Sequence, residues 1–179
     1  MLQLRRLLPL LASVVTLFAV PLVAPAGTGQ YPRSPAVATF VVDGQVAHPR
    51  TLTVEDLRQF PEQRVRARFG SGDGREEHRY RGALLLDVLQ AAQPQFDSET
   101  KNDALRHAVL VTASDGYQAA VAWGEIDPRF AATEVLLAYE EDRQPLARPR
   151  LVVPGDERGG RYVTDVTRVS LLRLSTATS

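Results

Sequence analysis

The chain has 179 residues, with 21 basic and 21 acidic side chains and no cysteine. This length suits one domain with a hydrophobic core, and the balanced charge gives no reason to expect nucleic acid or an anionic membrane surface as a partner. The lack of cysteine excludes disulfides, thiolate metal sites and thiol nucleophiles, so the core itself must stabilise the fold.

Residues 1–26 have the order of charged, apolar and small residues that is typical of a secretory signal peptide. Arg5 and Arg6 form the charged region, residues 7–23 form the apolar region, and a small-residue cleavage site ends at Ala26. We predict cleavage after Ala26 and an exported, periplasmic or secreted protein without stable membrane insertion. The alternative is an uncleaved membrane anchor, because the apolar run approaches the roughly 20 residues that span a bilayer.

The chain after the leader divides into a linker, one domain and a short tail. Residues 27–37 are rich in Gly, Pro and Ser without periodicity, which predicts an extended linker. The domain is expected to cover residues 38–175, and residues 176–179 form a Ser/Thr tail. No internal repeat is visible, so a single copy of one fold is predicted.

The domain opens with a predicted hairpin and a short helix. The apolar stretch 39–42, the turn residues Asp43-Gly44 and the apolar Val46 are typical of a strand, a tight turn and a short return strand. Thr53 has an acid three residues later, which is a capping-box pattern, so a short helix is expected over residues 54–60.

Two charged strands follow the first helix. Residues 64–69 alternate polar and apolar side chains, and a glycine-rich loop joins them to a second strand at residues 77–81. Arg64, Arg66 and Arg68 therefore share one face of the first strand. We interpret this face as a solvated edge strand that its charge keeps from aggregating; the alternative is an anion site.

Residues 83–92 form the most regular helical pattern of the chain. Leu85, Val88, Leu89 and Ala92 recur at helical spacing and share one face, which predicts a core helix. The residues expected in the core are Leu85, Val88, Leu89, Val109, Val111, Leu136, Leu137, Leu151 and Val153.

The second half of the domain is predicted to be rich in strands. The expected strands are 107–112, 117–122, 134–139, 151–153 and a last one that begins at Tyr162 and ends by Leu174, with a helical turn at 123–128 and an acidic turn at 140–143. Many strands, few short helices and no alternation of strand and helix predict a mixed α+β domain.

The stretch 149–163 carries the best candidate for a binding site. A buried strand ends at Pro154, and a loop rich in Gly, Asp and Arg follows, in which backbone amides and arginine forks suit an anionic ligand. The candidate binding residues are Arg150, Asp156, Arg158, Arg161 and Tyr162, with Asp115 and Tyr117 at the border of the same pocket. The alternative is structural: the acids pair with the arginines of their own loop, and Asp115 belongs to a hairpin turn.

Other chemistry has little support in the sequence. His48, His78 and His107 fall in separate elements with none of the usual ligand spacings, so no metal site made of protein atoms is predicted. No nucleophile elbow, Walker loop or dinucleotide fingerprint is present, which leaves hydrolase and phosphotransfer functions without support.

Three stretches carry a family resemblance. Pro149-Arg150-Leu151-Val152-Val153-Pro154 with its Gly/Arg loop, the turn Asp115-Gly116-Tyr117 and the strand 136–139 resemble the oxidoreductase molybdopterin-binding domain. The resemblance implies a sulfite-oxidase-like fold, which is a largely antiparallel sheet or barrel-like sandwich with two or three short helices. It also implies that Arg150 and the loop lie beside a pterin cofactor. The family places a cysteine, its molybdenum ligand, in the strand that corresponds to residues 64–69, where this sequence has none.

Two functions follow from this resemblance and its missing cysteine. The first is an exported binding module without the cysteine-ligated molybdenum centre and with no cofactor, whose partner is a small anionic ligand or a periplasmic protein. The second is a molybdopterin-dependent oxidoreductase that acts on a small oxyanion or oxide, with the metal held by the pterin alone. The loss of a central ligand favours the first, because a fold alone does not carry a function.

Overall fold

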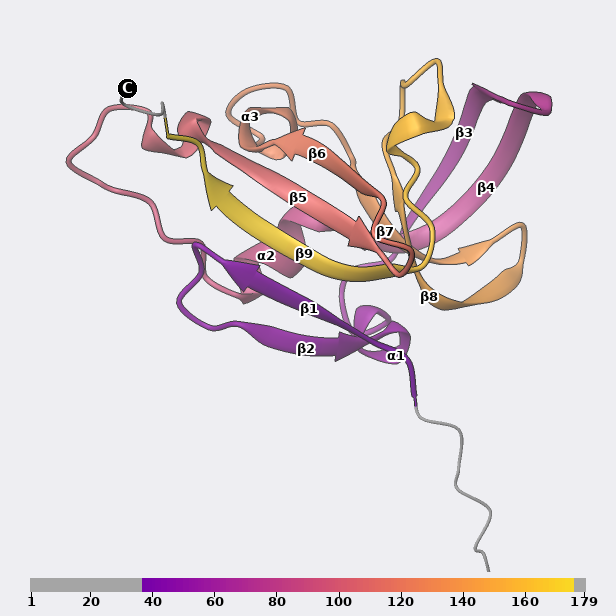
Figure 1. Ribbon diagram of the computed structural model, residues 1–179, viewed down its shortest axis with the longest axis horizontal. Helices are drawn as coiled ribbons and strands as arrows, with labels where there is room; N and C mark the ends of the chain where they lie inside the picture. The colour runs from indigo at the N-terminus through magenta and orange to yellow at the C-terminus, as the bar shows by residue number, and fades with distance from the viewer. Residues whose placement is uncertain (1–36, 176–179) are drawn as a thin grey trace, which may run out of the picture. The chain divides into compact units, whose positions relative to one another are not determined.

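The computed structural model describes residues 37–175 (Figure 1). The predicted leader and the tail lie outside the described residues, as does the linker apart from Val37. The strands are β1 (Thr39–Gly44), β2 (Arg50–Thr53), β3 (Gln63–Ser71), β4 (Gly74–Leu84), β5 (His107–Ala113), β6 (Gln118–Ala122), β7 (Leu136–Glu141), β8 (Gln144–Val152) and β9 (Val166–Arg173). The helices are α1 (Val54–Leu57), α2 (Leu85–Ala91) and α3 (Trp123–Ile126), with 3-10 turns η1 (Asp103–Arg106) and η2 (Gly159–Arg161). Within residues 37–175 no helix has the length and apolarity needed to cross a membrane.

The strands form two sheets. The five-stranded sheet has the order β2-β1-β9-β5-β6, and the four-stranded sheet has the order β3-β4-β7-β8 (Figure 1). Every paired strand in the described residues is antiparallel to its neighbours except β1 and β9, which run parallel. The domain is therefore α+β and largely antiparallel, as predicted, and it is built as two sheets with no closed barrel in the described part.

Several local predictions are confirmed. Thr53 accepts a hydrogen bond from the backbone N–H of Asp56 at 3.1 Å and completes the capping box at the start of α1. The helix is one turn long and ends at Leu57 rather than at Phe60. The predicted strand pair on either side of the glycine-rich loop is present. It is longer than expected: β3 and β4 pair through nine registered positions as far as Ser71 and Gly74.

Other predicted boundaries are wrong, and the strand predicted at 151–153 is β8, which begins already at Gln144. The strand that returns to β1 is β2, whereas Val46 forms only an isolated bridge with Pro94. The last strand begins at Val166 and not at Tyr162, since the chain makes a 3-10 turn just before Tyr162. The acidic turn after β7 is also shorter than predicted: Glu140 and Glu141 belong to the strand, and the turn itself is the left-handed pair 142–143.

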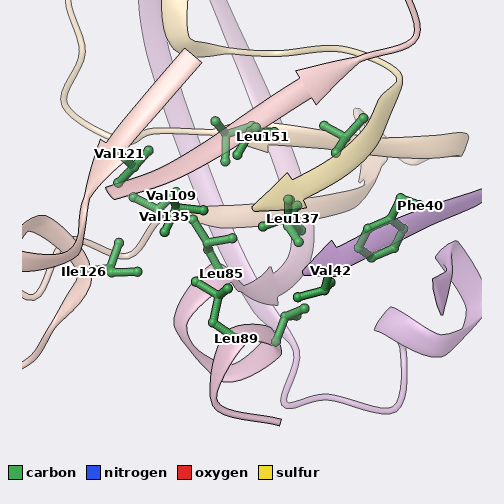
Figure 2. Close-up of a cluster of buried hydrophobic side chains, with 14 of the residues drawn as sticks. Phe40, Val42, Leu85, Leu89, Val109, Val121, Ile126, Val135, Leu137 and Leu151 are labelled. Atoms are coloured by element: carbon green, nitrogen blue, oxygen red, sulfur yellow. The ribbon is translucent and has the colours of Figure 1, made fainter. Parts of the chain in front are cut away.

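The main core lies between the two sheets and α2. Figure 2 shows Leu85 and Leu89 on α2 close to Val109, Val135 and Leu137 of the surrounding strands and loop. All nine residues predicted for the core are at most 1% exposed. The helical periodicity of α2 therefore identified the correct face, because burying apolar area is the main driving force for packing this helix.

A second, smaller core covers the other face of the four-stranded sheet. Side chains alternate along β8, so Leu151 faces the main core while Val152 faces away from it. The residues of this second core are Ala67, Phe69, Tyr80, Leu136, Ala138, Val152 and Tyr162. Tyr162 comes from the loop between β8 and β9, so part of this loop is packed onto the face that carries Arg150.

Candidate functional site

Arg150 lies on the second-core face of β8 and is held by a carboxylate of β7. Its Nη1 donates to both oxygens of Glu141, at 2.9 and 2.7 Å. The hydroxyl of Tyr80 donates to the same carboxylate at 3.0 Å, and burial raises the pKa of Tyr80 well above its usual value, so the phenol remains a donor. Glu141 thus neutralises Arg150 from within the sheet, while the Nε of Arg150 is buried without a partner among the described residues.

His78 lies on the same face of β4 as Tyr80 and also contacts carboxylates. Its Nδ1 lies 2.8 Å from Asp142 Oδ2, and its Nε2 lies 2.9 Å from Glu76 Oε2. Burial alone would lower the pKa of His78, but the hydrogen bonds to Asp142 and Glu76 and the nearby charge of Glu141 outweigh it and raise the pKa. The imidazole therefore binds its proton more tightly in the folded protein than in the unfolded chain.

This raised pKa predicts that His78 stabilises the fold at acidic pH. The contribution is complete below the unfolded pKa of about 6.5 and is lost as the pH rises through the higher folded pKa. Urea unfolding of the wild type and of His78→Gln at about pH 5.5 and about pH 8.5 measures it. We expect the wild type to exceed the variant by more at the lower pH; an equal difference at both values would contradict the assignment.

Arg161 and Asp156 form a pair that fixes the loop after β8. Arg161 donates to Asp156 through Nε at 2.9 Å and Nη2 at 2.6 Å, and its Nη1 donates to Glu125 of α3 at 2.8 Å. The hydrogen bonds to Asp156 and Glu125 raise the pKa of Arg161 above its already high value. Two carboxylates thus surround one guanidinium, so Arg161 anchors the loop to α3 and carries no excess positive charge for a ligand.

Tyr117 and Asp115 lie near this anchor and have structural partners. The hydroxyl of Tyr117 donates to the carbonyl of Gly160 at 2.6 Å, which ties the β5–β6 hairpin to η2. Asp115 accepts the backbone N–H of Tyr117 at 2.8 Å, the usual contact of an Asp-initiated turn. The structure therefore places Tyr117 against Gly160, the residue before Arg161 in the loop, while Asp115 shapes the hairpin.

Tyr162 is buried and packs against Phe69 at the end of β3. The two ring centroids are 4.2 Å apart, and the Tyr162 hydroxyl donates to the carbonyl of Val153 at 3.0 Å. A Cβ on Gly159 would lie 2.9 Å from the Phe69 ring, so backbone also lies close against this ring. The loop therefore packs closely against the Phe69 ring through Tyr162 and Gly159.

Arg158 is the exception among the predicted arginines. It is exposed and has no ion pair within the described residues. With Arg75, Ser71 and Glu157 it lines a hollow of about 290 Å³ beside Gly70. Among the arginines of the predicted site, Arg158 is the one that has no carboxylate partner within the described residues.

The sequence reasoning missed the carboxylates and aromatics that surround Arg150. Glu140 and Glu141 were interpreted as a solvated turn, whereas the side chain of Glu141 is only 17% exposed. The alternation of Glu76, His78 and Tyr80 along β4 was the available signal, because residues two apart share one face of a strand. The pattern alone could not identify what lies opposite that face.

Comparison with known proteins identifies the family of this domain. The family model described as the oxidoreductase molybdopterin binding domain matches residues 28–175. The chain belongs to this family. No curated protein matches the sequence. Among solved structures, the sulfane dehydrogenase SoxCD from Paracoccus pantotrophus is similar, with a TM-score of 0.61 and 18% identity over 75% of this chain. The match covers 38% of that longer chain, and at this identity it shows the shared fold alone.

The residues of this family member do not fit a thiolate-bound molybdenum. The chain has no cysteine, and in residues 37–175 no three His, Asp or Glu side chains are arranged to hold a metal ion. Phe69, near the end of the strand in which the family places its cysteine, packs against Tyr162 instead. Arg150 and Arg161 are already paired with carboxylates. This side of the four-stranded sheet is thus occupied by the chain's own side chains.

Proposed function

We propose that this member of the molybdopterin-binding-domain family is an exported binding module for an anionic partner and carries no thiolate-ligated molybdenum. The observation that carries the proposal is the packing of Phe69 on Tyr162 in a chain without cysteine. An aromatic ring has no lone pair that can replace a charged sulfur ligand. The fold is retained while the residue that would bind the metal is missing, and fold alone does not determine function.

The positive charge that remains at this end of the sheet supports an anionic partner. Arg158 and Arg75 have no carboxylate partner within the described residues and line the same hollow beside Gly70. Arginine forks bind carboxylate, sulfate or phosphate through paired hydrogen bonds. An anion at this position would contact groups that are already exposed, without breaking the Arg150–Glu141 or Arg161–Asp156 pairs.

Family membership favours a second candidate, a molybdopterin-dependent oxidoreductase. In that case the pterin dithiolene alone would hold the metal and supply the redox chemistry. The face that carries Arg150, beside which the resemblance places the pterin, also carries the packed rings of Phe69 and Tyr162. The two candidates differ in one measurable property, the metal content of the protein.

We expect protein purified from a cofactor-producing host to contain far less than stoichiometric molybdenum and tungsten after desalting, because the chain supplies no thiolate. Metal analysis and the fluorescence of extracted pterin measure this. A cysteine-containing member of the family, produced in the same cells, is the positive control. Near-stoichiometric metal in this protein would contradict the binding-module proposal and support the oxidoreductase.

The proposal of export rests on the leader-like order of residues 1–26. Its test is part of the same preparation, if the protein is expressed with its own N-terminus. N-terminal sequencing that begins at Gly27 would support export with cleavage after Ala26. A membrane-bound form that retains Met1 would instead indicate an anchor.

A further inference from the structure

An arginine-rich hollow lies on the β3–β4 hairpin, and the paired arginines that line it project from the face opposite to the second core. The registered pairs Arg64–Arg81 and Arg66–Arg79 place arginines directly opposite one another on this face. The hollow has a volume of about 420 Å³ and is lined by Arg64, Val65, Arg66, Arg79, Tyr80, Arg81, Glu140 and Arg143. No residue proposed for the end of the sheet near Arg158 belongs to this lining, so it is a separate surface.

The carboxylates on this face do not balance its arginines. Glu62 pairs with Arg64 and Arg81, Glu77 pairs with Arg66 and Arg68, and Glu140 pairs with Arg81. Arg79 and Arg143 have no ion pair within residues 37–175. The face therefore retains net positive charge where it is open to solvent.

The position of Arg143 is determined by the backbone. Both residues of the β7–β8 turn are left-handed, with φ of 49° at Asp142 and 68° at Arg143. The N–H of Asp142 donates to the carbonyl of Arg79 at 2.8 Å, and the N–H of Arg79 donates to Asp142 Oδ1 at 2.9 Å. This exchange fastens the turn to β4, so Arg143 is held beside Arg79 at the rim of the hollow.

The same hairpin has an open edge. β3 is the outer strand of the four-stranded sheet, with β4 on one side only. On the other side the N–H of Gly70 donates to the carbonyl of Glu157 at 2.8 Å, in an isolated parallel bridge with Arg158. Residues two apart on an antiparallel strand have the same backbone orientation, and β3 pairs with β4 without a register shift. The backbone groups of Arg64, Arg66 and Arg68 therefore also face outward.

We propose that β3 binds an extended acidic segment of a partner protein, which adds to this edge as a further strand. Main-chain hydrogen bonds would be made to the outward groups of Arg64, Arg66 and Arg68, and acidic side chains at alternate positions would face the arginines. The spacing fits, because alternate side chains on any strand repeat every ~6.6 to 6.8 Å. The bridge at Gly70 shows that this edge accepts a neighbouring backbone.

Charge also identifies the partner class. A second copy of the chain paired through β3 would place arginines opposite arginines, which is destabilising. A single small anion would use the guanidinium groups and leave the outward backbone groups of β3 without a protein partner. An acidic strand satisfies both features of the surface, the charge and the unpaired edge.

The test is a fluorescence-anisotropy titration with a labelled peptide of the sequence Glu-Thr-Glu-Val-Glu-Thr-Glu. We expect binding that weakens as salt increases. A permuted peptide with the same composition but consecutive glutamates should bind at least about tenfold more weakly. Two further peptides carry N-methyl groups at every second residue, one at the odd and one at the even positions. Only one edge of the peptide pairs with β3, so one of these two peptides should lose binding and the other should keep it.

Variants of the protein separate this surface from charge elsewhere. Arg79→Glu and Arg143→Glu should each lower the affinity for the peptide by roughly tenfold or more, and neither leaves a carboxylate without its ion-pair partner. Arg106→Glu is the control, since Arg106 is also exposed but is the last residue of η1, outside this face. Circular dichroism melting of each variant verifies that it is folded.

Equal affinity for the alternating and permuted peptides, or no loss in both arginine variants, would overturn the proposal. So would the absence of measurable binding to any of the peptides at low salt. This inference specifies the partner of the proposed binding module, but its failure is distinguishable from failure of that function. Metal content decides the function, whereas the peptide titration reports only on β3 and its arginines.

Discussion

The Leu89→Ala variant is expected to unfold with a free energy about 2 to 5 kcal/mol lower than that of the wild type. Leu89 is fully buried in α2, where its side chain contributes to the core between the two sheets (Figure 2). Truncation removes buried methyl groups and leaves a cavity that the surrounding strands can only partly fill. Urea denaturation followed by circular dichroism measures the change.

Leu174→Ala is the matched control for this prediction. Leu174 is 60% exposed, so the same truncation should change the free energy of unfolding by less than about 0.5 kcal/mol. A similarly small loss for Leu89→Ala would show that the packed face of α2 had been assigned wrongly.

Gly44→Ala should destabilise the domain by about 2 to 4 kcal/mol, because it combines backbone strain with a steric clash. Gly44 has φ of 89°, and a Cβ at this position would lie 2.1 Å from the carbonyl oxygen of Leu171. That oxygen also accepts the N–H of Gln45 at 2.7 Å, so the strands cannot separate without losing this bond. The clash occurs where the last residue of β1 pairs with β9.

Gly72→Ala is the control for Gly44→Ala. No atom lies within 4 Å of a Cβ built at Gly72, and its φ is outside the left-handed region. Thermal unfolding of the two variants should therefore show a large loss for Gly44→Ala and little change for Gly72→Ala. Equal melting temperatures would indicate that β1 and β9 separate enough to accept the extra methyl group.

Arg150 and Arg161 are each already paired with carboxylates, which affects how their roles in binding can be tested. Glu141 neutralises Arg150, and Asp156 with Glu125 surrounds Arg161. Removing one partner of such a half-buried pair leaves the other charge without compensation. A change in binding after mutation of Arg150 or Arg161 would therefore have to be distinguished from a change in folding, whereas Arg79, Arg143 and Arg158 allow a cleaner test.

Much of the fold could be predicted from local patterns. The helical spacing of Leu85, Val88 and Leu89 identified the buried face of α2, and Thr53 identified the start of α1. These predictions succeeded because they depend on residues within one or two turns of each other. Boundaries were less accurate: Tyr162 and Val46 were assigned to strands on their apolar character, whereas pairing with a distant segment decides where a strand ends.

The sequence by itself determined the core, the α+β class and the lack of a thiolate ligand, since these follow from composition and short-range periodicity. Only the tertiary structure decided which charges meet. The register shifts where β7 pairs with β4 and β8, so Glu141 faces Tyr80 and Arg150 while Glu140 faces Arg81. A shift of one residue exchanges the two faces of a strand. Because the position of a bulge depends on pairing between strands far apart in the chain, the partner of Arg150 could not be deduced from its neighbours in the sequence.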